Sequence, residues 1–143
     1  MSTTSSNRAM STTPGNRTLA WILLAIGIAA AVAGIFFGWY SQFWWFDEAI
    51  HAYNFFAMTL VLSLYLYGIV LTGAQQHSLV LILTVGLIAV GIGGLWEVAE
   101  WLYDIWFTQQ STIKSVPDRL IDLLMDGLGG LVAGWVLVSM VKK

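Results

Sequence analysis

Hydrophobic and polar positions along this chain separate into four long apolar runs joined by short polar segments. The runs cover residues 19–39, 47–71, 79–103 and 118–141. Each is long enough to cross the roughly 30 Å hydrocarbon core of a bilayer as an α-helix. The pattern therefore predicts an all-α integral membrane bundle of four transmembrane helices, which together form one domain over residues 19–143.

The segment before the first run, residues 1–18, is polar and rich in Ser and Thr. It consists of two similar nine-residue units, MSTTSSNRA and MSTTPGNRT. Because a folded segment rarely tolerates such an insertion, we interpret residues 1–18 as a disordered tail. The run at 19–39 is longer than the apolar region of a signal peptide, so we expect it to remain in the protein as a membrane helix.

Composition supports a membrane location and narrows the possible chemistry. Hydrophobic residues make up 58% of the chain and charged residues 10%, against about 25% charged in a soluble domain. The net charge of −2 gives no basic surface for nucleic acid. The absence of cysteine excludes disulfides, thiolate metal sites and a thiol nucleophile. We expect membrane lipids as partners. The sequence leaves open whether the chain also forms a homo-oligomer or binds another membrane protein.

Basic residues are distributed unevenly between the two sides of the predicted bundle. Four fall on the side of the chain termini and two on the opposite side; in that order they are Arg8, Arg17, Lys142 and Lys143, then Lys114 and Arg119. Because cytoplasmic segments carry the excess of Lys and Arg, we expect both termini in the cytoplasm. Aromatic residues also cluster at the two outer loops, at 39–46 and 101–107, and their rings favour the headgroup level of the bilayer.

The acidic residues show the opposite distribution, since all eight fall at the predicted outer end of the helices: Asp47, Glu48, Glu97, Glu100, Asp104, Asp118, Asp122 and Asp126. Asp126 lies about 12 Å along the last helix from Asp118. An ionisable group at such depth costs about 2.5–3.5 kcal/mol, so it normally faces the interior of the bundle. Glycines beside these acids, such as Gly93, Gly129 and Gly130, predict close helix packing that brings the acidic faces together.

This gathering predicts a polar site at the outer end, built from six residues: Asp47, His51, Glu97, Glu100, Asp122 and Asp126. Several carboxylates close together in a low dielectric cannot all be ionised. Some are protonated, or Arg119 and His51 pair with them, or a cation lies among them. Carboxylates with one imidazole suit Zn²⁺, Mn²⁺ or Fe²⁺, and an all-oxygen subset suits Mg²⁺ or Ca²⁺. As a metal site it would use Glu97 or Glu100 as the catalytic proton acceptor.

Three short motifs carry a resemblance to a known group of proteins: DEAIH at 47–51, EVAEW at 97–101 and RLIDLLMDGLGG at 119–130. In these the chain resembles the VanZ-like superfamily, and most closely a sister family of small bacterial inner-membrane proteins of unknown function. The resemblance implies the four-helix fold, a location in the bacterial inner (plasma) membrane, and family positions at the six site residues. It covers about residues 47–134. The chain departs from the pattern at Glu48, where relatives often carry Lys.

Three functions are open at this point, because the resemblance supplies no reaction. The first is a divalent-cation site that binds or acts on a lipid-linked phosphate, with the cation polarising an oxygen or activating water. The second is proton or cation handling, for which the inner half of the bundle offers no charged path. The third is a non-catalytic accessory protein whose polar network is structural.

Overall fold

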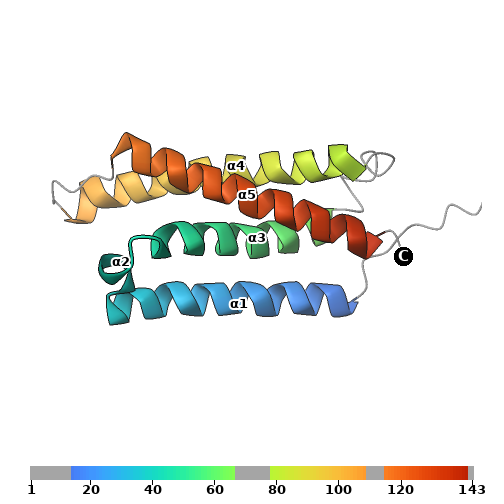
Figure 1. Cartoon of the computed structure of the whole chain (residues 1–143), viewed down its shortest axis with the longest axis horizontal. Coiled ribbons are helices and arrows are strands. Elements are labelled where there is room, and N and C mark those ends of the chain that lie inside the picture. The colour runs from blue at the N-terminus through green and yellow to red at the C-terminus, as the bar shows by residue number, and fades with distance from the viewer. Residues whose placement is uncertain (1–13, 67–77, 109–114, 142–143) are drawn as a thin grey trace, which may run out of the picture.

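The computed structural model of this chain describes residues 14–66, 78–108 and 115–141, and the elements in these ranges are helical. The elements are α1 (Pro14–Phe37), α2 (Trp39–Gln42), α3 (Phe46–Leu66), α4 (Ser78–Tyr103), a π-helical turn η3 (Asp104–Thr108) and α5 (Val116–Val141). The four long helices lie side by side along one axis (Figure 1). Each is long and apolar enough to cross a membrane, which confirms the predicted fold class.

Several helix ends differ from the prediction. Helix α1 begins at Pro14, so residues 14–18 belong to a helix. Proline is favoured at a first helical position because the N–H that it lacks would have no partner within the helix. The rest of the predicted tail, residues 1–13, lies outside the described residues, as does the predicted extension of α3 to residue 71. Helix α1 ends before Gly38, whose φ of 68° is the left-handed conformation that terminates helices.

The helices form a bundle in which α3 and α5 run in the same direction and α4 runs against both (Figure 1). Helix α5 packs against both α3 and α4, whereas α1 packs mainly on α3. The chain begins α1 and ends α5 at the same end of the bundle (Figure 1). Which side of the membrane this end occupies stays a prediction.

Small residues allow α5 to approach both neighbours closely. A Cβ on Gly129 would overlap the backbone of α3 at Ala52 and Phe56, and one on Gly130 would overlap α4 at Ala89. These contacts are the close glycine packing that the sequence predicts. The middle turns of α5 therefore pack closely against both α3 and α4.

The interior of the bundle divides into an apolar half and a polar half. Near the chain termini, the core consists of large aliphatic side chains that are at most 2% exposed: Leu60, Leu64, Leu81, Val85 and Leu137. The other half holds the buried charged and imidazole side chains. On the outside, many large apolar side chains are exposed, such as Phe36, Leu87 and Leu95. An apolar exterior of this kind suits lipid rather than water.

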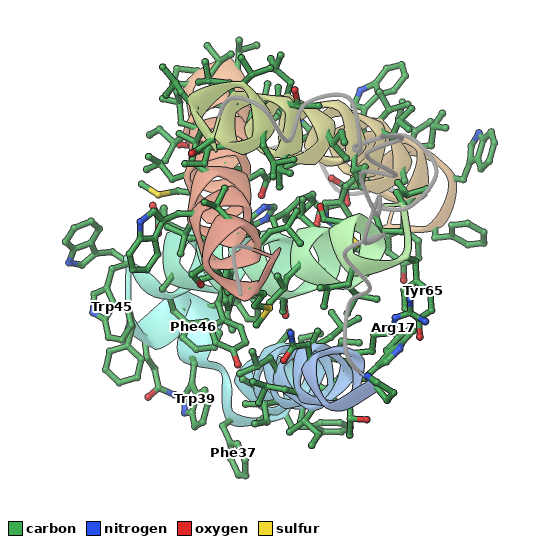
Figure 2. All side chains as sticks on the ribbon, turned by 90° about the vertical axis from the view of Figure 1, so that its right-hand side faces the viewer. Arg17, Phe37, Trp39, Trp45, Phe46 and Tyr65 are labelled. Carbon is green, nitrogen blue, oxygen red and sulfur yellow. The ribbon has the colours of Figure 1, made fainter. Side chains whose placement is uncertain are left out.

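Helix α1 is fixed to α3 at both ends. At the end near the chain termini, the guanidinium of Arg17 lies 4.9 Å from the ring centre of Tyr65, and Trp21 Nε1 donates a 3.1 Å hydrogen bond to the Tyr65 hydroxyl; Figure 2 shows Arg17 beside Tyr65. At the other end, Gly34 leaves room for the ring of Phe46. The ring of Tyr40 meets Phe46 edge-on at 4.9 Å. This packing fixes the start of α3 and the residues that follow Phe46.

Candidate functional site

The polar half of the bundle is built by two pairs of residues with helical spacing. Asp47 and His51 are four residues apart at the start of α3, and Asp122 and Asp126 are four apart in the first half of α5. Residues at this spacing lie on one face of a helix, one turn apart. Because α3 and α5 run in the same direction and pack together (Figure 1), the two pairs meet at the same end of the bundle.

His51 lies at the centre of this cluster, and the contact of its Nδ1 with Asp126 fixes the orientation of the imidazole ring. His51 Nδ1 lies 2.9 Å from Asp126 Oδ1, and the two side chains are 6% and 0% exposed. An ionised carboxylate only accepts hydrogen bonds, so with Asp126 ionised and the ring neutral the imidazole proton lies on Nδ1. The ring also stacks on Phe55, with 4° between the planes. In that tautomer Nε2 keeps its lone pair and is the nitrogen that can bind a metal ion.

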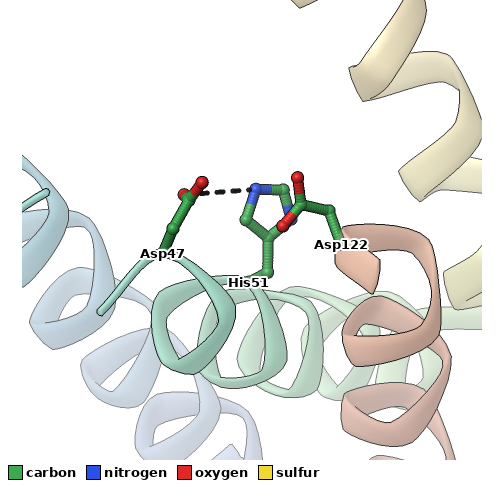
Figure 3. Close-up of side chains that lie close together, drawn as sticks. All are labelled: Asp47, His51 and Asp122. Carbon is green, nitrogen blue, oxygen red and sulfur yellow. Dashed lines mark ion pairs between the residues drawn. The ribbon is translucent and has the colours of Figure 1, made fainter. Parts of the chain in front are cut away.

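Asp47 and Asp122 lie around the imidazole. His51 Nε2 is 3.8 Å from Asp47 Oδ1. One ligand atom from each of Asp47, His51 and Asp122 lies within 4.8 Å of the other two, and Figure 3 shows the three side chains converging from α3 and α5. Two ligands about 2.1 Å from a cation are at most about 4.2 Å apart. Small side-chain rotations would thus close the group on an ion.

The two glutamates of α4 occupy different surroundings. Glu97 is buried, and its Oε2 accepts a 3.0 Å hydrogen bond from Arg119 Nη1 in α5. The same nitrogen donates to the backbone carbonyl of Glu97, also at 3.0 Å. Glu100 accepts a 2.9 Å hydrogen bond from Trp96 Nε1 on a face of α4 where Trp96 is half exposed. The structure therefore does not place Glu97 or Glu100 in the group of Asp47, His51 and Asp122.

Comparison with known proteins places the chain in a family. Residues 7–143 match the family described as "Predicted membrane protein (DUF2238)". The chain belongs to this family. It is also similar to an uncharacterized protein of Thermotoga maritima, with 30% identity over 101 residues that cover 69% of this chain and 50% of the relative. The chain thus spans about half the length of that relative. No solved structure matches it.

The description of the family as predicted membrane proteins agrees with the four helices that are long and apolar enough to cross a membrane. A link from this family to the VanZ-like superfamily stays a prediction, as does the location in the bacterial inner membrane. The site geometry in this DUF2238 protein therefore carries the functional argument.

Two features of the site go beyond the sequence analysis. The partner of Arg119 is Glu97 in another helix, where helical spacing alone offers Asp122. The second feature is Gly93, whose missing side chain leaves room for the carboxylate of Asp126 against α4. A clue to both exists in the sequence, because Gly93 and Glu97 are four residues apart and so share one face of α4.

The electrostatics of the cluster favour a positive charge. Three carboxylates, those of Asp47, Asp122 and Asp126, surround a single imidazole at the buried end of the group. His51 Nδ1 contacts Asp126, and the positive charge of Arg119 is paired with Glu97. Like charges in a low dielectric repel strongly unless a proton or cation lies between them. In this DUF2238 protein, the group of Asp47, His51 and Asp122 is the place for such a charge.

Proposed function

We propose that this DUF2238 protein holds a divalent cation between Asp47, His51 and Asp122. The observation that carries the proposal is the 2.9 Å contact of His51 Nδ1 with the fully buried Asp126. Metal-binding histidines almost always donate their second N–H to a carboxylate or carbonyl, which fixes the ring and raises the basicity of the ligating nitrogen. Here Nε2 faces Asp47 at 3.8 Å, and Asp122 belongs to the same group of ligand atoms.

The donor set indicates which ions fit. One imidazole nitrogen with two carboxylate oxygens suits Zn²⁺, Mn²⁺ or Fe²⁺. Three protein ligands leave coordination positions open, as catalytic metal sites do. Asp47 is 30% exposed, whereas His51 is 6% exposed and Asp122 2%. The open positions of the ion are therefore expected on the side of Asp47, where it could polarise an oxygen of a bound ligand or activate water.

The depth of this opening matches the headgroup region of a bilayer. Asp47 is the second residue of α3, and the side chains of Trp44 and Trp45 just before it are largely exposed. Tryptophan side chains favour the level of the headgroups. A cation held here would face the phosphates of the lipids and the adjoining water.

Transport of protons or ions is less well supported. Between the cluster and the other end of the bundle, the described interior is mainly aliphatic, with Leu60, Leu81 and Leu137, and its buried polar side chains there are the uncharged Thr59 and Ser63. A path for ions needs polar or wet surroundings. A site open at one end of the bundle is the simpler interpretation.

The proposal is tested by metal content in lipid nanodiscs. Wild-type protein, grown in medium with Zn²⁺, Mn²⁺ and Fe²⁺, is expected to retain about one divalent cation per chain by elemental mass spectrometry. Asp122→Asn is expected to lose it, whereas Glu100→Gln keeps it because Glu100 pairs with Trp96. Circular dichroism checks that each variant is folded. Equal, negligible metal in wild type and both variants would overturn the proposal and favour a structural polar network.

A further inference from the structure

The ion pair of Arg119 and Glu97 lies next to the proposed cation site, on its outer side. Glu97 is one turn further along α4 than Gly93, the residue that faces Asp126. On α5, Arg119 precedes Asp122 by three residues, or about 4.5 Å along the helix axis. Residues at this spacing are neighbours on a helix surface. The guanidinium is therefore placed about one helical turn from the cluster.

The guanidinium of Arg119 is only partly used by the protein. Its Nη1 donates to both the carboxylate and the carbonyl of Glu97. Its Nη2 is buried and has no hydrogen-bond partner in the described structure. Buried guanidinium nitrogens are normally paired, and an exception calls for a ligand, ion or water as acceptor. Glu97 thus holds the arginine in place while its second nitrogen lacks an acceptor.

The chemistry of arginine points to an anion with several oxygens. The planar fork of a guanidinium matches the geometry of phosphate and carboxylate. The N-terminus of α5 does not provide a competing site, because Ser115 and Asp118 cap it reciprocally, with Ser115 Oγ 2.6 Å from Asp118 Oδ2. Arg119 is also the only basic residue at this end among the described residues, since Arg17 lies at the other end.

We infer that Arg119 is the second anchor of a phosphate group whose first anchor is the proposed cation. One phosphate oxygen would bind the ion at an open position, and another would accept a hydrogen bond from Nη2, after the side chains that cover this nitrogen move aside. Combined cation and arginine contacts are a common way to hold phosphoryl groups. The inference rests on the proposed function, because the phosphate needs the cation.

The surrounding charges set the order of binding. Asp47, Asp122 and Glu97 would repel an anion that approaches a cation-free site. The cation therefore binds first and phosphate second, and each raises the affinity of the site for the other. Phosphate is expected to lower the Kd for Mn²⁺ by about tenfold, the value of one strong hydrogen bond to a charged group.

The experiment measures Mn²⁺ affinity by electron paramagnetic resonance of the free ion, with protein in dodecyl maltoside. Titrations are run alone, with inorganic phosphate, and with short-chain phosphatidic acid, each beside a protein-free control. Wild type and Arg17→Gln are expected to show the tenfold gain, and Arg119→Gln to bind Mn²⁺ with a clearly smaller gain, because only the contact of phosphate with the cation remains. A gain with the lipid alone assigns the ligand to a headgroup, and a gain with both probes assigns it to phosphate in general.

Failure of the phosphate inference and failure of the proposed cation site give different results in this experiment. If wild type binds Mn²⁺ but neither phosphate probe changes its affinity, the inference is overturned and the cation site stands. The inference is also overturned if Arg119→Gln keeps the full gain. If wild type binds no Mn²⁺, the proposed function and the inference both fall. Should Arg119→Gln not fold, Arg119→Lys keeps the charge beside Glu97 but lacks the fork, and a full gain in that variant contradicts the inference as well.

Discussion

The substitution Gly93→Ala tests whether Asp126 supports the cation site through His51. A Cβ at this position would overlap Asp126 Oδ2 and lie 3.0 Å from both Cβ and Cγ of Asp126. Asp126 is fully buried, so its carboxylate has little space into which it can move. The added methyl group is therefore expected to displace the carboxylate from its 2.9 Å contact with His51 Nδ1.

Gly93→Ala is expected to change both the affinity for the cation and the free energy of unfolding. Losing the carboxylate behind a ligating histidine typically weakens metal binding by about 10- to 100-fold. Overpacking lowers the free energy of unfolding by about 1–3 kcal/mol, and the better helix propensity of alanine over glycine returns up to about 1 kcal/mol. Gly93→Ala should thus remain folded, lose up to about 3 kcal/mol of stability and bind the cation much more weakly.

The neighbouring Gly94 supplies a matched control, because a Cβ there would meet nothing within 4 Å. Gly94→Ala is expected to gain up to about 1 kcal/mol of stability with unchanged cation affinity. Affinity is measured by Mn²⁺ titration in dodecyl maltoside, and stability by thermal unfolding followed by circular dichroism. The reasoning is refuted if Gly93→Ala binds Mn²⁺ as tightly as Gly94→Ala.

Three further substitutions test separate contacts. Asp126→Asn keeps an acceptor for His51 but removes the charge, so Mn²⁺ affinity should fall about tenfold; complete loss of binding would instead make Asp126 a direct ligand. Thr59→Val replaces a fully buried hydroxyl that has no hydrogen-bond partner among the described residues. It should be neutral or stabilising by about 1 kcal/mol in thermal unfolding; clear destabilisation would contradict this. Tyr65→Phe removes the hydrogen bond from Trp21 but keeps the ring, and should lower the unfolding free energy by about 0.5–1.5 kcal/mol; no change would show that the ring contact alone fixes α1.

Much of the architecture could be predicted from the sequence because a bilayer constrains backbone hydrogen bonding. Every N–H and C=O inside the hydrocarbon must be satisfied within the segment, so an apolar run of sufficient length becomes a helix. The helix ends were less predictable. Local chemistry decides them, as at Pro14, which begins α1, and at Gly38, which follows its last residue.

The candidate site was predictable in part. The four-residue spacing of Asp47 with His51, and of Asp122 with Asp126, places each pair on one face of its helix. The depth of Asp122 and Asp126 in an apolar helix indicates that this face is turned inward. The structure brings both pairs together around the imidazole of His51.

The sequence by itself determined which segments become membrane helices and which polar residues share a face of each one. Only the tertiary structure decided which faces meet: Glu97 of α4 pairs with Arg119 of α5, and Asp126 of α5 contacts His51 of α3. The physical reason is that helical periodicity fixes angles within a helix but not the rotation of one helix against another. That rotation depends on side-chain packing between helices, here on glycines such as Gly93 and Gly129 that let the backbones approach closely.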